Sequence, residues 1–231
     1  MAIHGKNYRS VAEKVKADAK YSVDEAIAFL QENPTAKFDE TFEFSFRMGV
    51  DPSKSDQSIR STVALPHGSG KDVRVIVFAT GDAATAAREA GAVEVGFEEL
   101  IAKVQGGWTD FDAAVATPDA MKEVRKVARV LGPRGLMPNP KTGTVTEDTA
   151  AAVNQLKAGR VEFRMDRNGN IAVPFGKRSF TSEALADNAQ AVMDAINGAR
   201  PATAKGTYIK RCTISSTMGP GLRVALKEVS A

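Results

Sequence analysis

The segment from Arg129 to Pro140 holds the residues of this chain that are hardest to explain as structure alone. Its three prolines lack a backbone donor and push the preceding residue out of the α region, while its two glycines tolerate positive φ. Arg129 and Arg134 add positive charge to this irregular backbone. Connections within compact domains are usually about 4–6 residues long, and longer ones tend to carry function. The sequence therefore predicts a stiff basic loop that contacts something outside the chain.

Positive charge gathers in two parts of a chain whose net charge is only +3. Residues 160–231 contain 11 Lys and Arg against 6 Asp and Glu, a balance of +5. A second basic run covers residues 122–141, where six Lys and Arg oppose Glu123 alone. Localised positive charge indicates a polyanionic partner. For residues 122–129 a solvated helix face is an equally good interpretation.

Residues 213–221 gather hydroxyls, a methionine and glycines at the expected end of a strand. Small hydroxyls and exposed peptide groups suit the 2′-hydroxyls and sugar edges of folded RNA, which presents a shallow minor groove. Gly219 would let the backbone approach closely, and Met218 would lie on a ribose or a base. The alternative is that residues 218–221 are only a turn between strands.

Lys37, Phe38 and Thr41 are a second set of RNA-facing candidates, at the start of a predicted strand. A cation and an aromatic ring beside a hydroxyl could contact a phosphate, a base and a sugar. Phe38 shares the parity of Phe42, so the alternative is that Phe38 forms the edge of a core.

Motifs for nucleotide or covalent chemistry are incomplete. Residues 68–71, Gly-Ser-Gly-Lys, lack the following Ser or Thr and the following helix of a phosphate loop. Residues 80–82, Thr-Gly-Asp, follow a predicted strand but lack the glycine spacing of a dinucleotide fingerprint. No nucleophile elbow is present, and neither His4 nor His67 has a catalytic partner in sequence. We therefore expect a protein that is no enzyme and uses no cofactor.

The single cysteine, Cys212, excludes an internal disulfide and, with only two histidines beside it, argues against a structural zinc site. No metal is expected. The chain has no run of about 18 or more apolar residues, and no apolar block follows the N-terminal charges. We therefore expect neither a membrane span nor a signal peptide, and a cytoplasmic location.

The elements expected in the two flanks of the chain have one buried face. Ser22 and Glu25 form a capping box for a helix over residues 22–33. Residues 41–50 alternate Phe or Met with polar residues, as a strand with one buried side requires. The further expectations are strands at 59–65, 161–165, 171–173, 208–216 and 222–227, a hairpin turn at Asn168-Gly169 and a helix over 182–198.

Residues 71–158 predict a different architecture, beginning with the almost wholly apolar strand 73–79. The elements expected after it are a helix at 82–89, a strand at 93–95, a helix at 97–104, a strand at 111–116, and helices at 119–131 and 147–158. Alternation with short links predicts a parallel sheet with right-handed crossovers and helices on both faces.

Neither flank alone has enough strands for a stable sheet, so we expect the flanks to join. The predicted fold class combines α/β and α+β in two domains. Residues 1–67 and 159–231 would form a discontinuous α+β domain, into which residues 68–158 insert a Rossmann-like three-layer α/β domain. The chain would cross between them at hinges that contain Gly68, Gly70 and Gly159.

Five stretches in order along the chain are specific enough to compare with known families. They are residues 37–41 (Lys-Phe-Asp-Glu-Thr), 65–68 (Leu-Pro-His-Gly), 132–140 (Gly-Pro-Arg-Gly-Leu-Met-Pro-Asn-Pro), 159–164 (Gly-Arg-Val-Glu-Phe-Arg) and 217–220 (Thr-Met-Gly-Pro). Together they closely resemble the bacterial L-one family of large-subunit ribosomal proteins, the proteins of the mobile stalk beside the tRNA exit site.

This resemblance implies a split two-domain fold and a monomer when free, with no membrane partner. It also implies binding to a folded region of large-subunit (23S) ribosomal RNA within the large ribosomal subunit. Two further roles come with it, namely the release of deacylated tRNA from the exit site and repression of the protein's own operon through an mRNA site that mimics the ribosomal one.

The resemblance also assigns residues by matching position. The primary ribosomal RNA contacts it implies are Lys37, Phe38, Thr41, Arg164, Lys177, Ser179, Ser215, Thr217, Met218 and Gly219. Arg134 and Lys141 would lie on a secondary surface toward ribosomal RNA or tRNA. Arg167 and Arg178 depart from the residues that the family commonly has, but both keep the surface basic.

Two other functions remain as alternatives at this point. One is an RNA-binding regulator that acts wholly off the ribosome. The other is a nucleotide-binding enzyme that uses the middle α/β domain, against which the missing glycine fingerprint argues.

Overall fold

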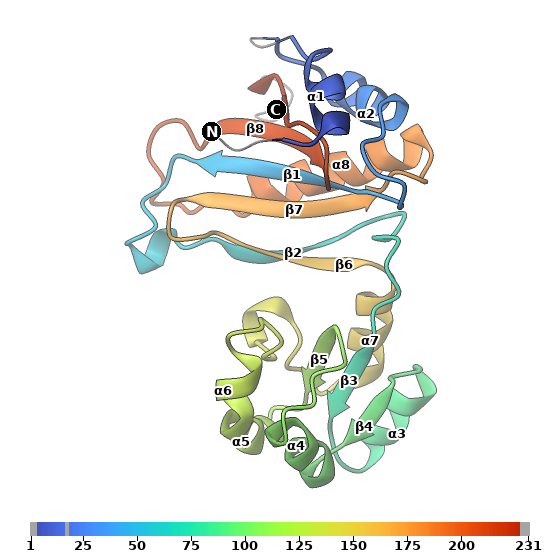
Figure 1. Cartoon of the computed structure of the whole chain (residues 1–231). Coiled ribbons are helices and arrows are strands. Elements are labelled where there is room, and N and C mark those ends of the chain that lie inside the picture. The colour runs from blue at the N-terminus through green and yellow to red at the C-terminus, as the bar shows by residue number, and fades with distance from the viewer. Residues whose placement is uncertain (1–3, 17–18, 227–231) are drawn as a thin grey trace. The chain divides into compact units, whose positions relative to one another are not determined.

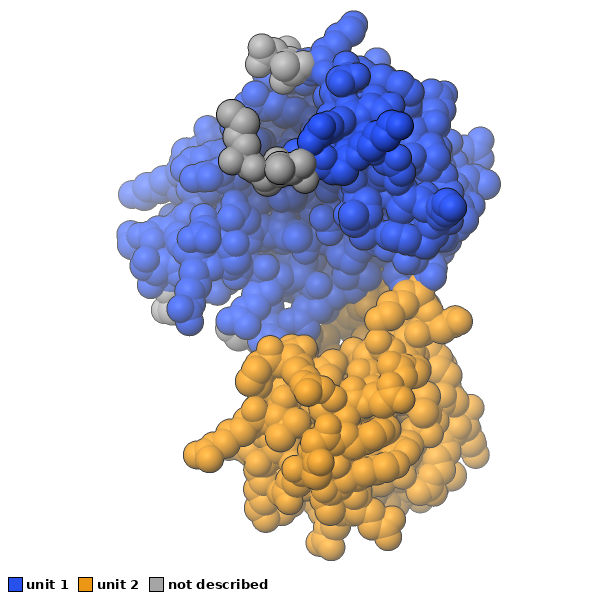
Figure 2. Space-filling model, viewed as in Figure 1, with its two compact units in different colours: residues 1–70, 161–231 blue, residues 71–160 orange. Residues whose placement is uncertain are grey.

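The computed structural model of the protein describes residues 4–16 and 19–226 (Figure 1). The chain forms two compact units, which Figure 2 shows in different colours. Unit 1 consists of residues 1–70 and 161–231, and unit 2 consists of residues 71–160. Of the helices in the described residues, none is long and apolar enough to cross a membrane.

Unit 1 is built on an antiparallel sheet with the strand order β7-β1-β8-β9. A separate sheet pairs β2 with β6, whose first residue is the last residue of unit 2. The strands are β1 (Thr41–Met48), β2 (Arg60–Ala64), β6 (Arg160–Arg164), β7 (Asn170–Lys177), β8 (Ile209–Ser216) and β9 (Leu222–Arg223). The helices are α1 (Lys6–Ala12), α2 (Val23–Glu32), the 3₁₀ helix η1 (Ser55–Gln57) and α8 (Ser182–Gly198).

The β7-β1-β8-β9 sheet has one buried and one open face. Along β1 the side chains alternate between buried Phe or Met and the exposed residues Glu43, Ser45 and Arg47. Helices α2 and α8 pack on the buried face, and α8 lies behind the sheet in Figure 1. The one-sided strand predicted from alternation is therefore confirmed.

Local sequence explains the start of α2. The Ser22 Oγ accepts a hydrogen bond from the Glu25 N–H at 3.2 Å, and the Glu25 carboxylate accepts one from the Ser22 N–H at 2.9 Å. These two bonds satisfy backbone donors that the first turn of a helix leaves without partners. The capping box predicted from Ser22 and Glu25 is confirmed.

The predicted hairpin at Asn168-Gly169 was wrong in its pairing. The turn forms, with Gly169 at φ 78°, but β6 lies beside β2 and β7 lies beside β1. The Asp166 carboxylate accepts hydrogen bonds from the backbone N–H groups of Asn168 at 2.8 Å and of Asn170 at 2.7 Å. Together with the backbone hydrogen bond from the Asp166 N–H to the Asn170 carbonyl oxygen at 2.8 Å, these bonds close the loop locally, and the two strands beyond it belong to different sheets.

Unit 2 holds a parallel sheet with the strand order β4-β3-β5. Val75 and Val77 of β3 pack in one buried cluster with α3 and α7, whereas Ile76 and Phe78 pack in another with α4 and α5. The elements are β3 (Val75–Phe78), α3 (Asp82–Glu89), β4 (Glu94–Gly96), α4 (Glu98–Gln105), β5 (Ala113–Ala116), α5 (Met121–Val124), η2 (Arg125–Val127), α6 (Ala128–Leu131), η3 (Pro140–Thr142) and α7 (Thr149–Lys157).

The single helix predicted over residues 119–131 is broken into α5, the 3₁₀ segment η2 and α6. Val124 and Val127 are both fully buried. A 3₁₀ turn has about three residues, so it places side chains three positions apart on the same face. The burial of both valines keeps this face of the broken helix packed against the core of unit 2.

The basic loop that follows α6 has no regular structure before η3, as predicted. Gly135 adopts φ 72°, which favours glycine. Gly132 has φ −59°, in the right-handed region that any residue can adopt. Leu136 and Met137 pack against the core of unit 2, while Arg134 remains exposed. The loop is thus fixed by its apolar residues and presents its charge outward.

Candidate nucleic-acid interface

The ends of β1, β7 and β8 bring three of the predicted contact residues together in unit 1. The Thr217 Oγ1 accepts a hydrogen bond from the Thr41 N–H at 2.9 Å and lies 3.3 Å from the Thr41 carbonyl oxygen, to which it can donate. The Lys177 Nζ donates to the Thr41 Oγ1 at 2.8 Å. Thr41 and Thr217 are 176 positions apart in the chain, so the sheet register brings the three residues together. Thr41, Lys177 and Thr217 form the Thr41 group.

Two exposed apolar side chains flank this group. Phe38 precedes β1 by three residues and is 54% exposed, and Met218 follows Thr217 and is 57% exposed. Among the described residues, Phe38 is not one of the side chains that pack against the buried core of unit 1. The interpretation of Phe38 as the edge of a core is therefore wrong.

Carboxylates behind the site hold its backbone in place. Glu40 is fully buried, and its carboxylate accepts hydrogen bonds from the Thr35 hydroxyl at 2.6 Å and from the Ser216 hydroxyl at 3.3 Å. Asp39 accepts hydrogen bonds from the backbone N–H of Ser179 at 3.0 Å and from its hydroxyl at 2.7 Å. Ser179 thus lies next to the segment that carries Phe38, as expected for a shared surface.

Sequence reasoning missed Glu40. It lies in a run of polar residues before β1, where a carboxylate is expected to be solvated. Only the pairing of β1 with β8 shows that Ser216 faces it. No local signal in the sequence could have identified this buried acid.

Gly219 has a structural explanation of its own. A Cβ on Gly219 would stand 2.4 Å from the Ser216 Oγ, which is closer than atoms can approach. The Gly219 N–H donates to the Ser216 carbonyl oxygen at 3.1 Å. The residue therefore closes the turn after β8 and places Met218, whether or not RNA approaches it.

The remaining predicted contacts are more dispersed. Ser215 lies on β8 opposite Glu43, with its Oγ 3.5 Å from a Glu43 carboxylate oxygen. Lys37 is exposed in the segment before Phe38. Arg164 is exposed at the end of β6, in the other sheet of the unit, and no contact in the described residues joins it to the Thr41 group.

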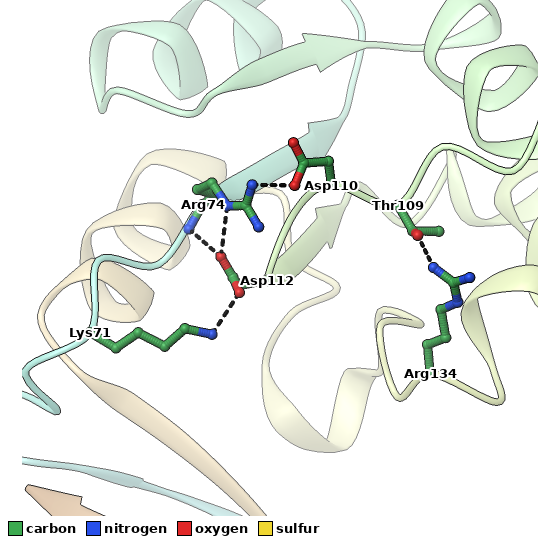
Figure 3. A network of polar contacts seen from close by, with 6 residues as sticks. All are labelled: Lys71, Arg74, Thr109, Asp110, Asp112 and Arg134. Carbon is green, nitrogen blue, oxygen red and sulfur yellow. Dashed lines mark hydrogen bonds and ion pairs between the residues drawn. The ribbon is translucent and has the colours of Figure 1, made fainter. Parts of the chain in front are cut away.

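The secondary candidates lie in unit 2. The Arg134 guanidinium donates to the Thr109 hydroxyl, as Figure 3 shows. Lys141 belongs to η3, and its side chain lies outside the described part of the structure. Lys122, Arg125 and Arg129 are exposed on the broken helix that precedes the loop.

The glycines predicted at the hinges all have positive φ. The values are 73° for Gly68, 69° for Gly70 and 102° for Gly159, a region that residues with a Cβ rarely adopt. Each of these positions therefore requires glycine in the observed conformation.

A buried asparagine, Asn188 of α8, anchors the first crossing within unit 1. The Asn188 Oδ1 accepts a hydrogen bond from the His67 N–H at 3.0 Å, and its Nδ2 donates to the carbonyl oxygens of Gly68 at 3.0 Å and Phe175 at 2.9 Å. The side chain is fully buried, so these bonds are needed to offset its desolvation. Sequence reasoning missed Asn188, because only the apolar residues of the helix predicted over 182–198 were considered.

A charged cluster anchors the same crossing within unit 2 (Figure 3). The Asp112 carboxylate accepts hydrogen bonds from the Lys71 Nζ at 2.6 Å and the Arg74 Nε at 3.0 Å, and Arg74 also pairs with Asp110. The hydrogen bond from Lys71, followed by those from Arg74, lowers the pKa of Asp112 to about 2 against the opposing effect of its partial burial.

This geometry suits binding rather than catalysis. Hydroxyls, lysines and exposed apolar faces can contact the sugars, phosphates and bases of a nucleic acid. The Thr41 group contains no activated nucleophile or general base, since its hydroxyls hydrogen-bond with a lysine and with the backbone.

Comparison with known proteins agrees with this interpretation. A model of the ribosomal protein L1p/L10e family matches residues 30–220 of the chain. The large ribosomal subunit protein uL1 of Cutibacterium acnes is 58% identical over 219 residues, which cover 95% of this chain and 94% of the relative. The similarity thus extends over both units and over all the contact residues predicted from sequence.

Proposed function

Since the chain belongs to the L1p/L10e family of ribosomal proteins, we propose that it binds large-subunit (23S) ribosomal RNA through the ends of β1, β7 and β8. The family consists of structural proteins of the ribosome and not of enzymes, so the chain is a constituent of the large ribosomal subunit in the cytoplasm. The observation that carries the proposed site is the hydrogen-bonded group of Thr41, Lys177 and Thr217 beside exposed Phe38 and Met218.

Each side chain of the site has a distinct task in this proposal. Phe38 and Met218 pack on bases or riboses, because their apolar surfaces are exposed. Thr41 and Thr217 present hydroxyls and peptide groups to 2′-hydroxyls. Lys177 and Lys37 neutralise phosphates. Arg164, Ser179, Ser215 and Gly219 complete the contact surface at its edges.

Each of the two units would have a separate role. We regard unit 1 as the discontinuous RNA-binding domain and unit 2 as an inserted, Rossmann-like domain. Arg134 and Lys141 of unit 2 would face ribosomal RNA or the exit-site tRNA. Movement of unit 2 about Gly68, Gly70 and Gly159 would then assist the release of deacylated tRNA.

Repression of the protein's own operon follows from the same site. An mRNA that reproduces the ribosomal RNA structure would compete for the Thr41 group when the protein is in excess and monomeric. Nothing beyond one RNA-binding surface is required for this regulation.

The test is the affinity of the full chain for a ribosomal RNA fragment from the side stalk, with a scrambled hairpin of equal length as control. We expect preference for the stalk fragment, and loss of that preference when Thr217 is replaced by valine. Equal affinity for both RNAs would overturn the proposal.

The alternative of an off-ribosome regulator predicts a different distribution in cells. A ribosomal constituent sediments with large subunits after a high-salt wash, whereas a free regulator is removed by it. Recovery of the protein only in the unbound fraction would favour the regulator.

A further inference from the structure

Three cations meet on the open face of the unit 1 sheet, at the end away from the Thr41 group. Arg47 of β1 lies directly opposite Arg211 of β8, and both side chains are exposed. Like charges directly opposite one another in a sheet are destabilising. The only outward-facing carboxylate on β1 and β8 is Glu43, which lies near the other end of β1.

A β-bulge adds the third cation. The register changes between Arg47, which pairs with Arg211, and Met48, which pairs with Ile209, so Lys210 is the extra residue. Ile209 and Cys212 are buried while both residues between them are exposed, so the bulge directs Lys210 away from the core as well. Its Cε lies 3.4 Å from where a Cβ on Gly49 would stand, which places the side chain beside the end of β1.

In the described part of the chain, no ion pair reaches Arg47, Lys210 or Arg211. The carboxylates of the adjoining loops, Asp51 and Asp166, accept hydrogen bonds from backbone N–H groups of their own loops. An external anion is therefore the partner that this cluster fits.

We propose that Arg47, Lys210 and Arg211 bind the phosphate backbone of the RNA that is held at the Thr41 group, an inference that rests on the proposed function. Arg47 lies six positions after Thr41 on β1, so the two sites lie about 20 Å apart at about 3.4 Å per residue. RNA engaged at the Thr41 group and running along the open face would reach the cluster. The cluster would contact phosphates only, adding affinity without sequence preference.

The test compares the full chain with the triple variant Arg47→Gln, Lys210→Gln, Arg211→Gln for binding to the same ribosomal RNA fragment over a series of salt concentrations. The slope of log affinity against log salt should fall by roughly 0.7–0.9 for each cation removed. At about 0.1 M salt we expect at least a tenfold loss of affinity. Arg88→Gln removes one exposed cation of α3 in unit 2, outside the proposed site, and is the control for loss of a charge elsewhere on the protein.

A stability measurement separates binding from folding. Arg47→Gln alone relieves the repulsion with Arg211, so its melting temperature should stay unchanged or rise while RNA affinity falls. A fall in melting temperature that accounts for the weaker binding would overturn the proposal. So would a salt slope equal to that of Arg88→Gln.

The outcome also distinguishes this inference from the proposed function. One result would be that the wild type binds the stalk fragment selectively, with weaker binding by Thr217→Val, while the triple variant has the same salt slope as Arg88→Gln. That result would refute only the proposed phosphate binding by Arg47, Lys210 and Arg211. If the wild type shows no selectivity, the proposed function fails first.

Discussion

Thr217 links the strand ends of the site through one hydroxyl. This hydroxyl accepts from the Thr41 N–H and can donate to the Thr41 carbonyl oxygen, so it fixes the distance between β1 and the turn after β8. The sequence could suggest both residues as contacts but not their hydrogen bonds, because residues 176 positions apart meet only through sheet register. Buried Glu40 was missed for a similar reason, because Thr35 lies close to it in sequence but its other hydroxyl partner, Ser216, is 176 positions away.

Thr217→Val should weaken binding to the ribosomal RNA fragment by about 1–3 kcal/mol, because valine can neither hold Thr41 nor meet a polar group of the RNA. Thr217→Ser keeps the hydroxyl and should retain most of the affinity. Binding isotherms and melting curves of both variants check this. A loss of affinity that only follows a fall in melting temperature would show that the segment is a structural turn.

Met218→Ala should weaken RNA binding by about 1–3 kcal/mol, the scale of a lost base stack, without lowering stability. Met218 is 57% exposed, so its removal leaves no cavity. Val93→Ala is the matched control, because Val93 of unit 2 is 55% exposed and lies outside every proposed contact. Equal affinities of the two variants would remove Met218 from the site.

At the scale of elements, patterns confined to one segment predicted the structure well. Alternation found β1, and the Ser22–Glu25 spacing found the start of α2. Patterns that depend on packing elsewhere did not. No proline or glycine in residues 119–131 marks the break in the helix at η2, and the pairing of β6 with β2 joins segments from the two flanks of the chain.

The charged cluster of Lys71, Arg74, Asp110 and Asp112 connects the first segment of unit 2 to the residues before β5. It makes the free energy of unfolding depend on pH. The pKa of Asp112 in the folded protein is about 2, below the ordinary value of 3.8. The cluster therefore contributes fully above about pH 4 and is lost as the pH falls toward 2.

Asp112→Asn should lower the free energy of unfolding by about 1–2 kcal/mol near neutral pH, with a difference from wild type that vanishes near pH 2. Urea unfolding across this pH range measures it. Lys71→Gln should reduce the pH dependence but not abolish it, because the hydrogen bond from Lys71 is the largest single cause of the lowered pKa and the hydrogen bonds from Arg74 remain. A difference that is constant with pH would show that the carboxylate charge is irrelevant.

At the scale of the whole molecule, the residues on either side of the first crossing are each anchored within their own unit. Asn188 holds the Gly68 carbonyl within unit 1, and a Cβ on Gly70 would stand 2.7 Å from the Lys177 Cγ in the same unit. Lys71 is held by Asp112 in unit 2. We therefore propose that rotation between the units is concentrated between Gly70 and Lys71 and in the second crossing at Gly159.

We therefore expect the two units to move relative to one another in the free protein. Cysteines introduced for exposed Glu183 of α8 and Glu99 of α4 can carry fluorescent labels. Cys212 can remain, because burial raises the pKa of its thiol to about 12 and leaves it unreactive. Single-molecule energy transfer should show a broad or two-peaked distance distribution.

Gly159→Ala tests the cause of this motion, since alanine is strained at φ 102° and should shift the distribution toward other conformations of the crossing. Gly107→Ala is its control, a glycine at φ 95° that lies within unit 2 and away from both crossings. If the wild type gives one narrow distance that neither RNA nor Gly159→Ala alters, the chain is rigid. Any movement of the stalk would then have to arise in the ribosomal RNA, and the positive-φ glycines would serve only to turn the chain between the units.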